Sequence, residues 1–177
     1  KAATKSGNFY TGNLSESKNV MHIPTGQIQQ DVQRTATAAL NSGTSPETRV
    51  EYGGHVLFGD TNARIWDAGT TMQTQILSDG STEKKWSVKP FKIGGKNNQF
   101  GGLISQIQFF WHIHPNGSTP SRGDIWWVGE LRKYGFTGNS FLIDINNNRV
   151  IFFNEKGSLM NIKYDDFKRM GKQEDIK

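Results

Sequence analysis

Apolar side chains recur along the chain at helical spacing in two regions that predict helices. Residues 24–40 show this spacing in four apolar positions, which are Ile28, Val32, Ala36 and Leu40. Thr25 stands where the N-cap of this helix is expected. Residues 164–171, with the sequence YDDFKRMG, predict a second and shorter helix near the C-terminal end.

A further helix is predicted over residues 121–136 by its start and stop signals. Ser121 is the expected N-cap, and Asp124 stands three positions later, as in a capping box. Gly135 is the expected end of the helix.

Three other segments favour strands. Residues 49–59 alternate despite two adjacent glycines, with apolar side chains at Val50, Val56 and Phe58. Residues 103–114 predict a strand, or a short helix running into one. Residues 140–157 predict a hairpin, because two apolar runs are joined by an Asn-rich turn. The order of helices and strands predicts a single α/β domain, in which helices flank a mixed sheet.

Polar segments at both ends set the expected limits of the domain. We expect it to occupy residues 23–170, between a polar leader at 1–22 and a polar tail at 171–177. Within it, residues 60–100 predict short strands and long loops, because Gly, Asn, Asp, Thr and Lys dominate. Long loops in a compact domain are often functional, so substrate specificity is expected there.

The amino-acid composition limits which kinds of protein and which kinds of catalytic or metal site are possible. The 177 residues include 5 Trp and 11 Phe, enough for one sizeable core. The net charge of +5 fits an acidic partner or simply a solvated basic surface. The absence of cysteine excludes disulfides, thiolate catalysis and Cys-ligated zinc. No apolar run approaches membrane-spanning length and no signal peptide is evident. Since the chain begins at Lys1, we expect a piece of a longer protein or a processed product.

The predicted strand at 103–114 ends with two histidines one residue apart. Residues i and i+2 of a strand face the same side, so His112 and His114 are expected to project together, while Ile113 faces the core. The short loop PNGSTP lets Asp124, in the first turn of the next helix, return to them. Three such ligands and an open position for water are typical of catalytic zinc. We therefore expect one Zn²⁺, although other divalent metals accept the same ligands.

Hydrolysis at such a site also requires a base and a donor for the developing oxyanion. Glu51 is the candidate base, because it lies in the other predicted strand, and Gly53 and Gly54 then leave room for close backbone approach. The Ser121 hydroxyl, beside Asp124, is the candidate donor to the oxyanion.

Each of these residues also has an ordinary structural interpretation. The two histidines can be structural, Ser121 and Asp124 can be only a capping box, and Glu51 can be a strand-edge carboxylate. Two further histidines are interpreted as non-ligands: His22 falls in the leader, and His55 is expected on the same strand face as Glu51. The combination of residues therefore carries the hypothesis.

The combination resembles the signature of the JAMM (JAB1/MPN/Mov34) metalloprotease family, which reads His-x-His, usually Pro, a short spacer, Ser, two residues and Asp. HIHPNGSTPSRGD matches this pattern, and VEYGGHVLFG resembles the family's Glu-bearing strand. DVQRTATAAL resembles its first helix, and FLIDINNNRVIFFNEKG resembles the closing hairpin of bacterial members. The resemblance covers roughly residues 27–160. One departure concerns Ser121, because the spacer before it is one residue shorter than is common in the family.

The resemblance implies a cytidine-deaminase-like mixed sheet flanked by helices, with the zinc ligands, base and oxyanion donor named above. Glu51 would also pass a proton to the leaving amine. The implied activity is that of a peptidase or isopeptidase acting on a protein or peptide substrate.

Bacterial relatives include toxin domains at the ends of secreted polymorphic toxins, and the polar leader and absent cysteine fit that context. We accordingly expect an exported effector that acts in the cytoplasm of a target cell, has a cognate immunity protein and does not bind membranes. Two alternatives remain: a binding module that kept the fold and lost catalysis, and a metal-dependent nuclease, with nucleic acid the less favoured partner.

Overall fold

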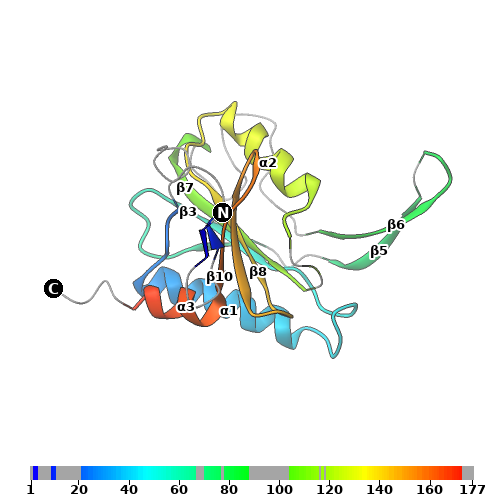
Figure 1. Ribbon diagram of the computed structural model, residues 1–177, viewed down its shortest axis with the longest axis horizontal. Coiled ribbons are helices and arrows are strands. Elements are labelled where there is room, and N and C mark those ends of the chain that lie inside the picture. Colours follow the sequence, from blue (N-terminus) through cyan, green and yellow to red (C-terminus); the bar gives the residue numbers. More distant parts are fainter. Residues whose placement is uncertain are drawn as a thin grey trace.

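A mixed β-sheet of eight strands forms the centre of the protein in the computed structural model (Figure 1). Its strands are β1 (Ala2–Ala3), β2 (Phe9–Tyr10), β3 (Gly53–Leu57), β4 (Arg64–Ile65), β7 (Ile107–His114), β8 (Ser140–Asp144), β9 (Arg149–Asn154) and β10 (Gly157–Lys163). They lie in the order β1-β2-β10-β9-β8-β7-β3-β4. β7 and β8 are parallel and the other paired strands are antiparallel.

The structure describes residues 2–3, 9–10, 21–66, 70–76, 78–87, 104–115, 117 and 119–172. For residues 2–3, 9–10, 70–76 and 82–87 it describes the backbone alone. The end of the segment 60–100, from residue 88 on, and most of the expected tail lie outside the described residues.

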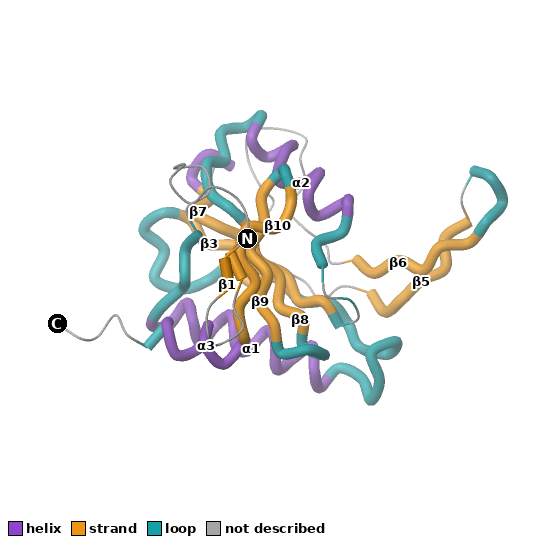
Figure 2. The backbone as a smooth tube through the Cα atoms, viewed as in Figure 1, coloured by secondary structure: helices purple, strands orange, loops and turns teal. Residues whose placement is uncertain are grey.

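Helices cover both faces of the sheet (Figure 2). They are α1 (Gly26–Asn41), α2 (Arg122–Arg132) and α3 (Tyr164–Met170), and a short 3-10 turn, η2 (Ile104–Gln106), precedes β7. Alternation along β7 separates two cores: one includes Phe109, Trp111 and Ile113 with side chains of α1 and α3. The other includes Phe110 with Val128 and Leu131 of α2.

A second, two-stranded sheet extends away from the domain (Figure 1). Its strands are β5 (Thr70–Ile76) and β6 (Thr82–Ser87), which pair in antiparallel fashion. This hairpin lies within the segment 60–100, for which short strands were expected.

The predicted helices are confirmed, with one error in the buried face of α1. Ser121 is the N-cap of α2 in a complete capping box, and Gly135 follows the helix with a φ of 97°. Leu40 was expected on the buried face of α1, but its side chain is 44% exposed. The buried positions are Val32, Ala36 and Ala39, so the adjacent Leu40 points about 100° away from that face.

The strand predicted over 49–59 is shorter than expected. β3 begins at Gly53, so Glu51 lies in the segment that leads into the strand rather than within it. Phe58 was included in the predicted strand but is 58% exposed, because β3 ends at Leu57 and Phe58 begins the turn that follows.

The sequence pattern missed β10, since the predicted hairpin ended at Gly157. A register shift between Ser158 and Met160 leaves Leu159 and Met160 buried in succession, and this interrupts the alternation. The edge of the sheet beyond β10 is formed by β2 and then β1, both from the residues expected to form a leader. In the part of the chain that the structure describes, no helix is long and apolar enough to cross a membrane.

Candidate metal centre

The last residues of β7 carry the two adjacent histidines. His112 and His114 follow Phe110 on the face of the sheet that α2 covers, whereas Ile113 belongs to the opposite core. The ring of His112 packs edge-on against Phe153 on the same face. Both histidines are largely buried, with 6% of His112 and 9% of His114 exposed. The alternation expected from the sequence is therefore confirmed.

The start of α2 brings Asp124 to these histidines. Its carboxylate oxygen Oδ2 accepts a hydrogen bond from the Ser121 backbone N–H at 2.8 Å, and its own N–H donates to Ser121 Oγ at 3.1 Å. This capping box fixes the carboxylate relative to the helix axis. The same carboxylate also faces the histidines, so capping and contact with the imidazoles occur together.

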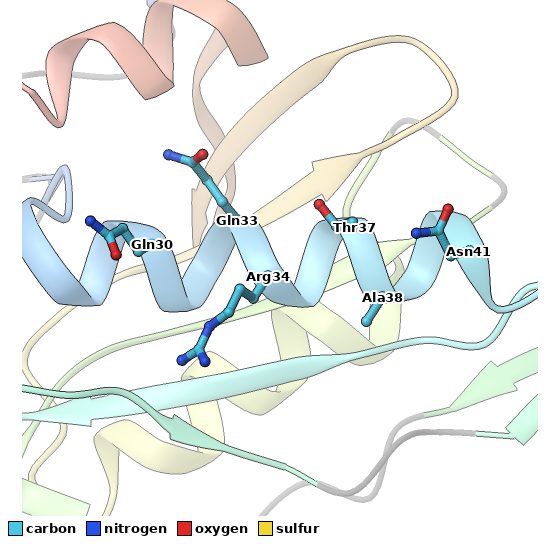
Figure 3. Close-up of a pocket in the computed structure, with 6 residues that line it drawn as sticks. All are labelled: Gln30, Gln33, Arg34, Thr37, Ala38 and Asn41. Carbon is cyan, nitrogen blue, oxygen red and sulfur yellow. The ribbon is translucent and has the colours of Figure 1, made fainter.

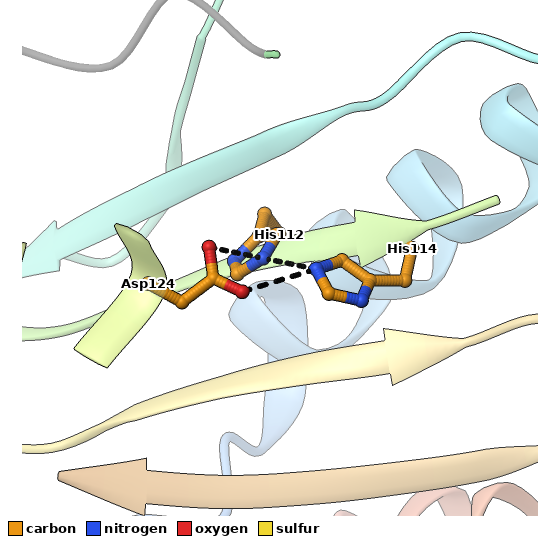
Figure 4. A group of neighbouring side chains, drawn as sticks. All are labelled: His112, His114 and Asp124. Atoms are coloured by element: carbon orange, nitrogen blue, oxygen red, sulfur yellow. Dashed lines mark hydrogen bonds and ion pairs between the residues drawn. The ribbon is translucent and has the colours of Figure 1, made fainter. Parts of the chain in front are cut away.

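His112, His114 and Asp124 form a compact cluster (Figure 4). The two Nε2 atoms lie 2.7 Å apart. His112 Nε2 lies 3.2 Å from Asp124 Oδ1, and His114 Nε2 lies 3.2 Å from Oδ2. One candidate ligand atom from each residue lies within 4.8 Å of the others. The cluster is therefore close enough to bind a metal ion.

With Asp124 ionised, protons on the two imidazoles do not satisfy the three contacts of this cluster. Each Nε2 carries at most one hydrogen. If both nitrogens are protonated, their hydrogens collide across the 2.7 Å contact between the rings. If only one is protonated, the bare nitrogen of the other ring faces a carboxylate oxygen without a hydrogen between them. A cation placed between the two unprotonated Nε2 atoms and the Asp124 carboxylate would attract all three groups, so no hydrogen would be needed between them.

The spacing requires only a small adjustment to hold zinc. In a tetrahedral site with Zn–N bonds of about 2.0–2.1 Å, ligand nitrogens lie about 3.3 Å apart. The Nε2 atoms lie 2.7 Å apart, somewhat closer than that value, and each lies 3.2 Å from a carboxylate oxygen of Asp124.

Electrostatics favours the ionised form of Asp124. Burial opposes ionisation, but the neighbouring His112, and then His114, outweigh that effect and hold the pKa of the Asp124 carboxyl well below its usual range. The side chain therefore offers a carboxylate, which is the protonation state that a metal ligand needs.

Glu51 reaches the same face of the sheet through the register of β3 and β7. Gly53 pairs with His112, and the Ile113 N–H donates to the Tyr52 carbonyl at 2.7 Å, so the pairing continues beyond the end of β3. The next position in this register places Glu51 opposite His114. Glu51, Gly53 and the two histidines therefore share one face, and Glu51 is only 7% exposed.

Trp66 covers the strand beside His112. A Cβ atom on Gly53 would lie 2.9 Å from the Trp66 ring and 2.6 Å from the Trp111 carbonyl oxygen, so only glycine fits there. The Trp66 Nε1–H donates to His55 Nδ1 at 2.8 Å. Burial, reinforced by nearby Arg64 and partly offset by Asp60, lowers the pKa of His55 to about 4. His55 is therefore a neutral, buried partner of Trp66.

Ser121 and His22 occupy different surroundings. Ser121 is exposed at the start of α2, and its hydroxyl oxygen accepts the capping bond from the Asp124 N–H. His22 lies on the other side of the sheet, where its ring stacks on Phe109 with the centroids 5.2 Å apart. The structure thus brings Ser121 next to Asp124 and keeps His22 away from the cluster.

Sequence reasoning did not identify Trp66, Asn146 or Arg49 as parts of this region. Trp66 had a weak signal, as an isolated tryptophan in a polar segment. Asn146 lies in the Asn-rich turn, where Asn is common for backbone reasons alone. Arg49 lies two residues before Glu51 and has no distinctive pattern around it.

A hollow of about 520 Å³ lies elsewhere, along the outer side of α1 (Figure 3). It is lined by Gln30, Gln33, Arg34, Thr37, Ala38 and Asn41, all from this helix. The lining contains no histidine and no acidic residue, and the helix covers the sheet face opposite the cluster. The hollow therefore does not belong to the candidate metal centre.

Comparison of this chain with known proteins finds no matching family model, no matching curated protein and no matching solved structure.

Proposed function

We propose that the protein is a single-zinc hydrolase of amide bonds, a peptidase or isopeptidase of the JAMM type. The observation that carries the proposal is the cluster of His112, His114 and Asp124, whose candidate ligand atoms lie within 4.8 Å of one another and whose three contacts imidazole protons do not satisfy while Asp124 is ionised. Two imidazoles and one carboxylate are ligand types that suit catalytic zinc, in which water takes the fourth position. The mixed sheet and the order of the motif residues agree with the cytidine-deaminase-like fold that this proposal includes.

Glu51 is assigned the role of general base. A zinc ion bound at the cluster supplies Lewis-acid chemistry, which makes water acidic enough to lose a proton near neutral pH. The register of β3 and β7, continued to Glu51, puts this residue on the same side of the sheet as the candidate ligands, and its carboxylate is assigned to accept that proton. The oxygen of the water bonds to the carbonyl carbon of the substrate, and Glu51 then transfers the proton to the nitrogen of the leaving amine as the amide C–N bond breaks.

Ser121 is assigned the role of oxyanion donor. Its capping bond uses the hydroxyl oxygen as an acceptor, so that bond does not consume the hydroxyl hydrogen. That hydrogen is directed to the carbonyl oxygen of the substrate as negative charge develops there. Because Ser121 also caps the helix that carries Asp124, its position relative to the ligands is fixed by α2.

The biological context included in this proposal is that of an exported bacterial effector. Its substrate is a protein or peptide of the target cell, and a cognate immunity protein protects the producer. The β5–β6 hairpin supports this proposal as a recognition element, because it extends away from the domain (Figure 1).

The experiment that tests this function combines metal analysis with Glu51→Gln. We expect about one zinc per chain in the purified protein and in the variant, since Glu51 is not a ligand. We expect the variant to lose about 10²- to 10⁴-fold in hydrolysis of a peptide library and to lose growth inhibition on expression. Glu47→Gln is the matched control, because Glu47 is exposed in the loop that leads to Glu51.

Two results would contradict the proposal. Absence of bound metal after reconstitution with zinc would remove its basis. Retention of the biological effect by Glu51→Gln, with zinc bound and the fold intact, would instead identify a metal-bearing binding module.

A further inference from the structure

The turn between β8 and β9 contacts both segments that build the candidate centre. The Asn146 Nδ2 amide donates to the Pro115 carbonyl oxygen at 3.0 Å, and Pro115 directly follows His114. The Asn146 Oδ1 oxygen accepts from Arg49 Nη1 at 3.0 Å, and Arg49 lies two residues before Glu51. One side chain therefore joins the chain just after the metal ligands to the chain just before the proposed base.

The turn holds this amide in a defined place. Asp144 is fully buried, and its Oδ1 atom accepts from the backbone N–H groups of Asn146 and Asn147, both at 3.2 Å. Its Oδ2 atom accepts from Asn147 Nδ2 at 2.7 Å. Asp144 also pairs with His114 in the parallel register of β7 and β8, so the turn begins beside the second histidine.

The segment before Glu51 is also held by backbone bonds to another part of the chain. Its backbone bonds run to the loop after α1, where the Arg49 N–H donates to the Ser45 carbonyl and the Val50 N–H donates to Ser42 Oγ. Those bonds fix the segment to the loop rather than to the metal ligands. Toward the end of β7, the Ile113 N–H bonds to the Tyr52 carbonyl, and Asn146 bonds to both Arg49 and Pro115.

We propose that Asn146 is a positioning residue that sets the spacing between Glu51 and the metal ligands by clamping Arg49 to Pro115. This inference rests on the proposed metal-dependent function. Asn146 does not contact substrate or metal. It acts on the ligand side through Pro115 and on the base side through Arg49.

Asn146→Ala tests the clamp, and Asn147→Ala is its matched control. Asn147 lies in the same turn, but its side chain bonds to Asp144 within the turn and not to either segment. Zn²⁺ affinity is measured by competition with a chromophoric chelator, and ligand geometry by the visible absorption bands of the Co²⁺-substituted protein. We expect Asn146→Ala to weaken Zn²⁺ binding about tenfold and to shift the Co²⁺ bands. Asn147→Ala is expected to leave both unchanged.

Asn146→Asp provides a second variant that keeps the size and backbone bonds of the residue. It retains an acceptor for Arg49 and removes the Nδ2 donor to Pro115, so it is also expected to weaken Zn²⁺ binding and shift the Co²⁺ bands. The clamp is overturned if both Asn146 variants bind Zn²⁺ with the wild-type affinity and spectrum, or if Asn147→Ala changes them equally. Failure of the wild-type protein to bind Zn²⁺ would instead contradict the proposed function.

Discussion

At the scale of single residues, the bond from Trp66 to His55 places a neutral imidazole in the sheet face that carries the candidate metal ligands. Trp66 is 4% exposed and His55 is fully buried. Because His55 Nδ1 accepts the indole hydrogen, protonation of His55 at that nitrogen would break the bond. The position of Trp66, which covers the strand beside His112, therefore depends on His55 remaining neutral.

This pair predicts that the protein loses stability on mild acidification. Burial lowers the pKa of His55 from 6.5 to about 4, so the unfolded chain binds a proton that the folded chain rejects. The contribution is fully present above pH 6.5 and is lost as the pH falls toward 4. Between pH 7 and pH 5 this amounts to about 2 kcal/mol of the free energy of unfolding.

Urea denaturation in the presence of a chelator measures this effect, with His55→Gln as the comparison. The glutamine keeps an acceptor for Trp66 and does not titrate, so its loss of stability between pH 7 and pH 5 should be smaller than that of the wild type. An equal loss in both proteins would show that other groups cause the pH dependence.

The residues of the candidate site differ in how far the sequence predicts them. His112, His114 and Asp124 lie close together in the chain, so strand alternation and a capping signal place them on physical grounds. Glu51 was assigned to a strand that begins only after it, because its position depends on the register between β3 and β7. Asn146 acts through bonds to distant segments, and no local spacing predicts such bonds.

At the scale of elements, Asp31 joins α1 to the edge of the sheet. Its side chain is 2% exposed and accepts from the Ala63 N–H at 2.9 Å, just before β4, while it also pairs with Arg34. Burial opposes ionisation of Asp31, but these bonds and one from Gln27 outweigh that effect and hold its pKa below the usual 3.8. The carboxylate therefore fixes the loop between β3 and β4 against the helix.

Asp31→Asn is expected to destabilise the protein by about 2 kcal/mol at pH 7, because the charged acceptor of the Ala63 bond is lost. Asp165→Asn is the control, since that side chain is 83% exposed and pairs with Lys168 in the same i,i+3 arrangement. Its expected cost is below about 0.5 kcal/mol. Chemical denaturation measures both values.

The pH dependence of Asp31→Asn provides a separate check. The contribution of Asp31 is present above its unfolded pKa of about 3.9 and is lost as the pH falls toward its lower folded pKa. The difference from the wild type should therefore shrink below about pH 4. Equal costs for the two variants at pH 7 would contradict the role of Asp31.

Elements with strong end signals were predicted well. The capping box and Gly135 located α2, whereas β10 was missed because its bulge removes the alternation. The limits of β3 were also misjudged, since Arg49 and Val50 look strand-like in sequence but bond to the loop after α1. The local sequence pattern therefore predicts the limits of a helix or strand only where neighbouring segments do not change its hydrogen-bonded pairing.

At the scale of the whole molecule, metal binding is expected to stabilise the fold. An ion that binds only the folded chain adds about 2.7 kcal/mol at a concentration one hundred times its Kd. For a domain of this size that corresponds to a rise in Tm of roughly 5–11 °C. Thermal denaturation with and without Zn²⁺ measures the shift, and Asp124→Asn should abolish it. The same shift in Asp124→Asn would mean that zinc binds elsewhere.

The three candidate ligands all lie within residues 112–124, whereas the proposed base lies far earlier in the chain. Bringing these ligands together closes only a short loop, so it costs little chain entropy compared with pairing β3 to β7. If the protein binds a metal as proposed, β7 and α2 would therefore be able to hold the ion during folding before Glu51 reaches the site. Zinc occupancy would then mark the assembly of one strand and one helix, and catalytic competence would begin only when the distant strand joins the sheet.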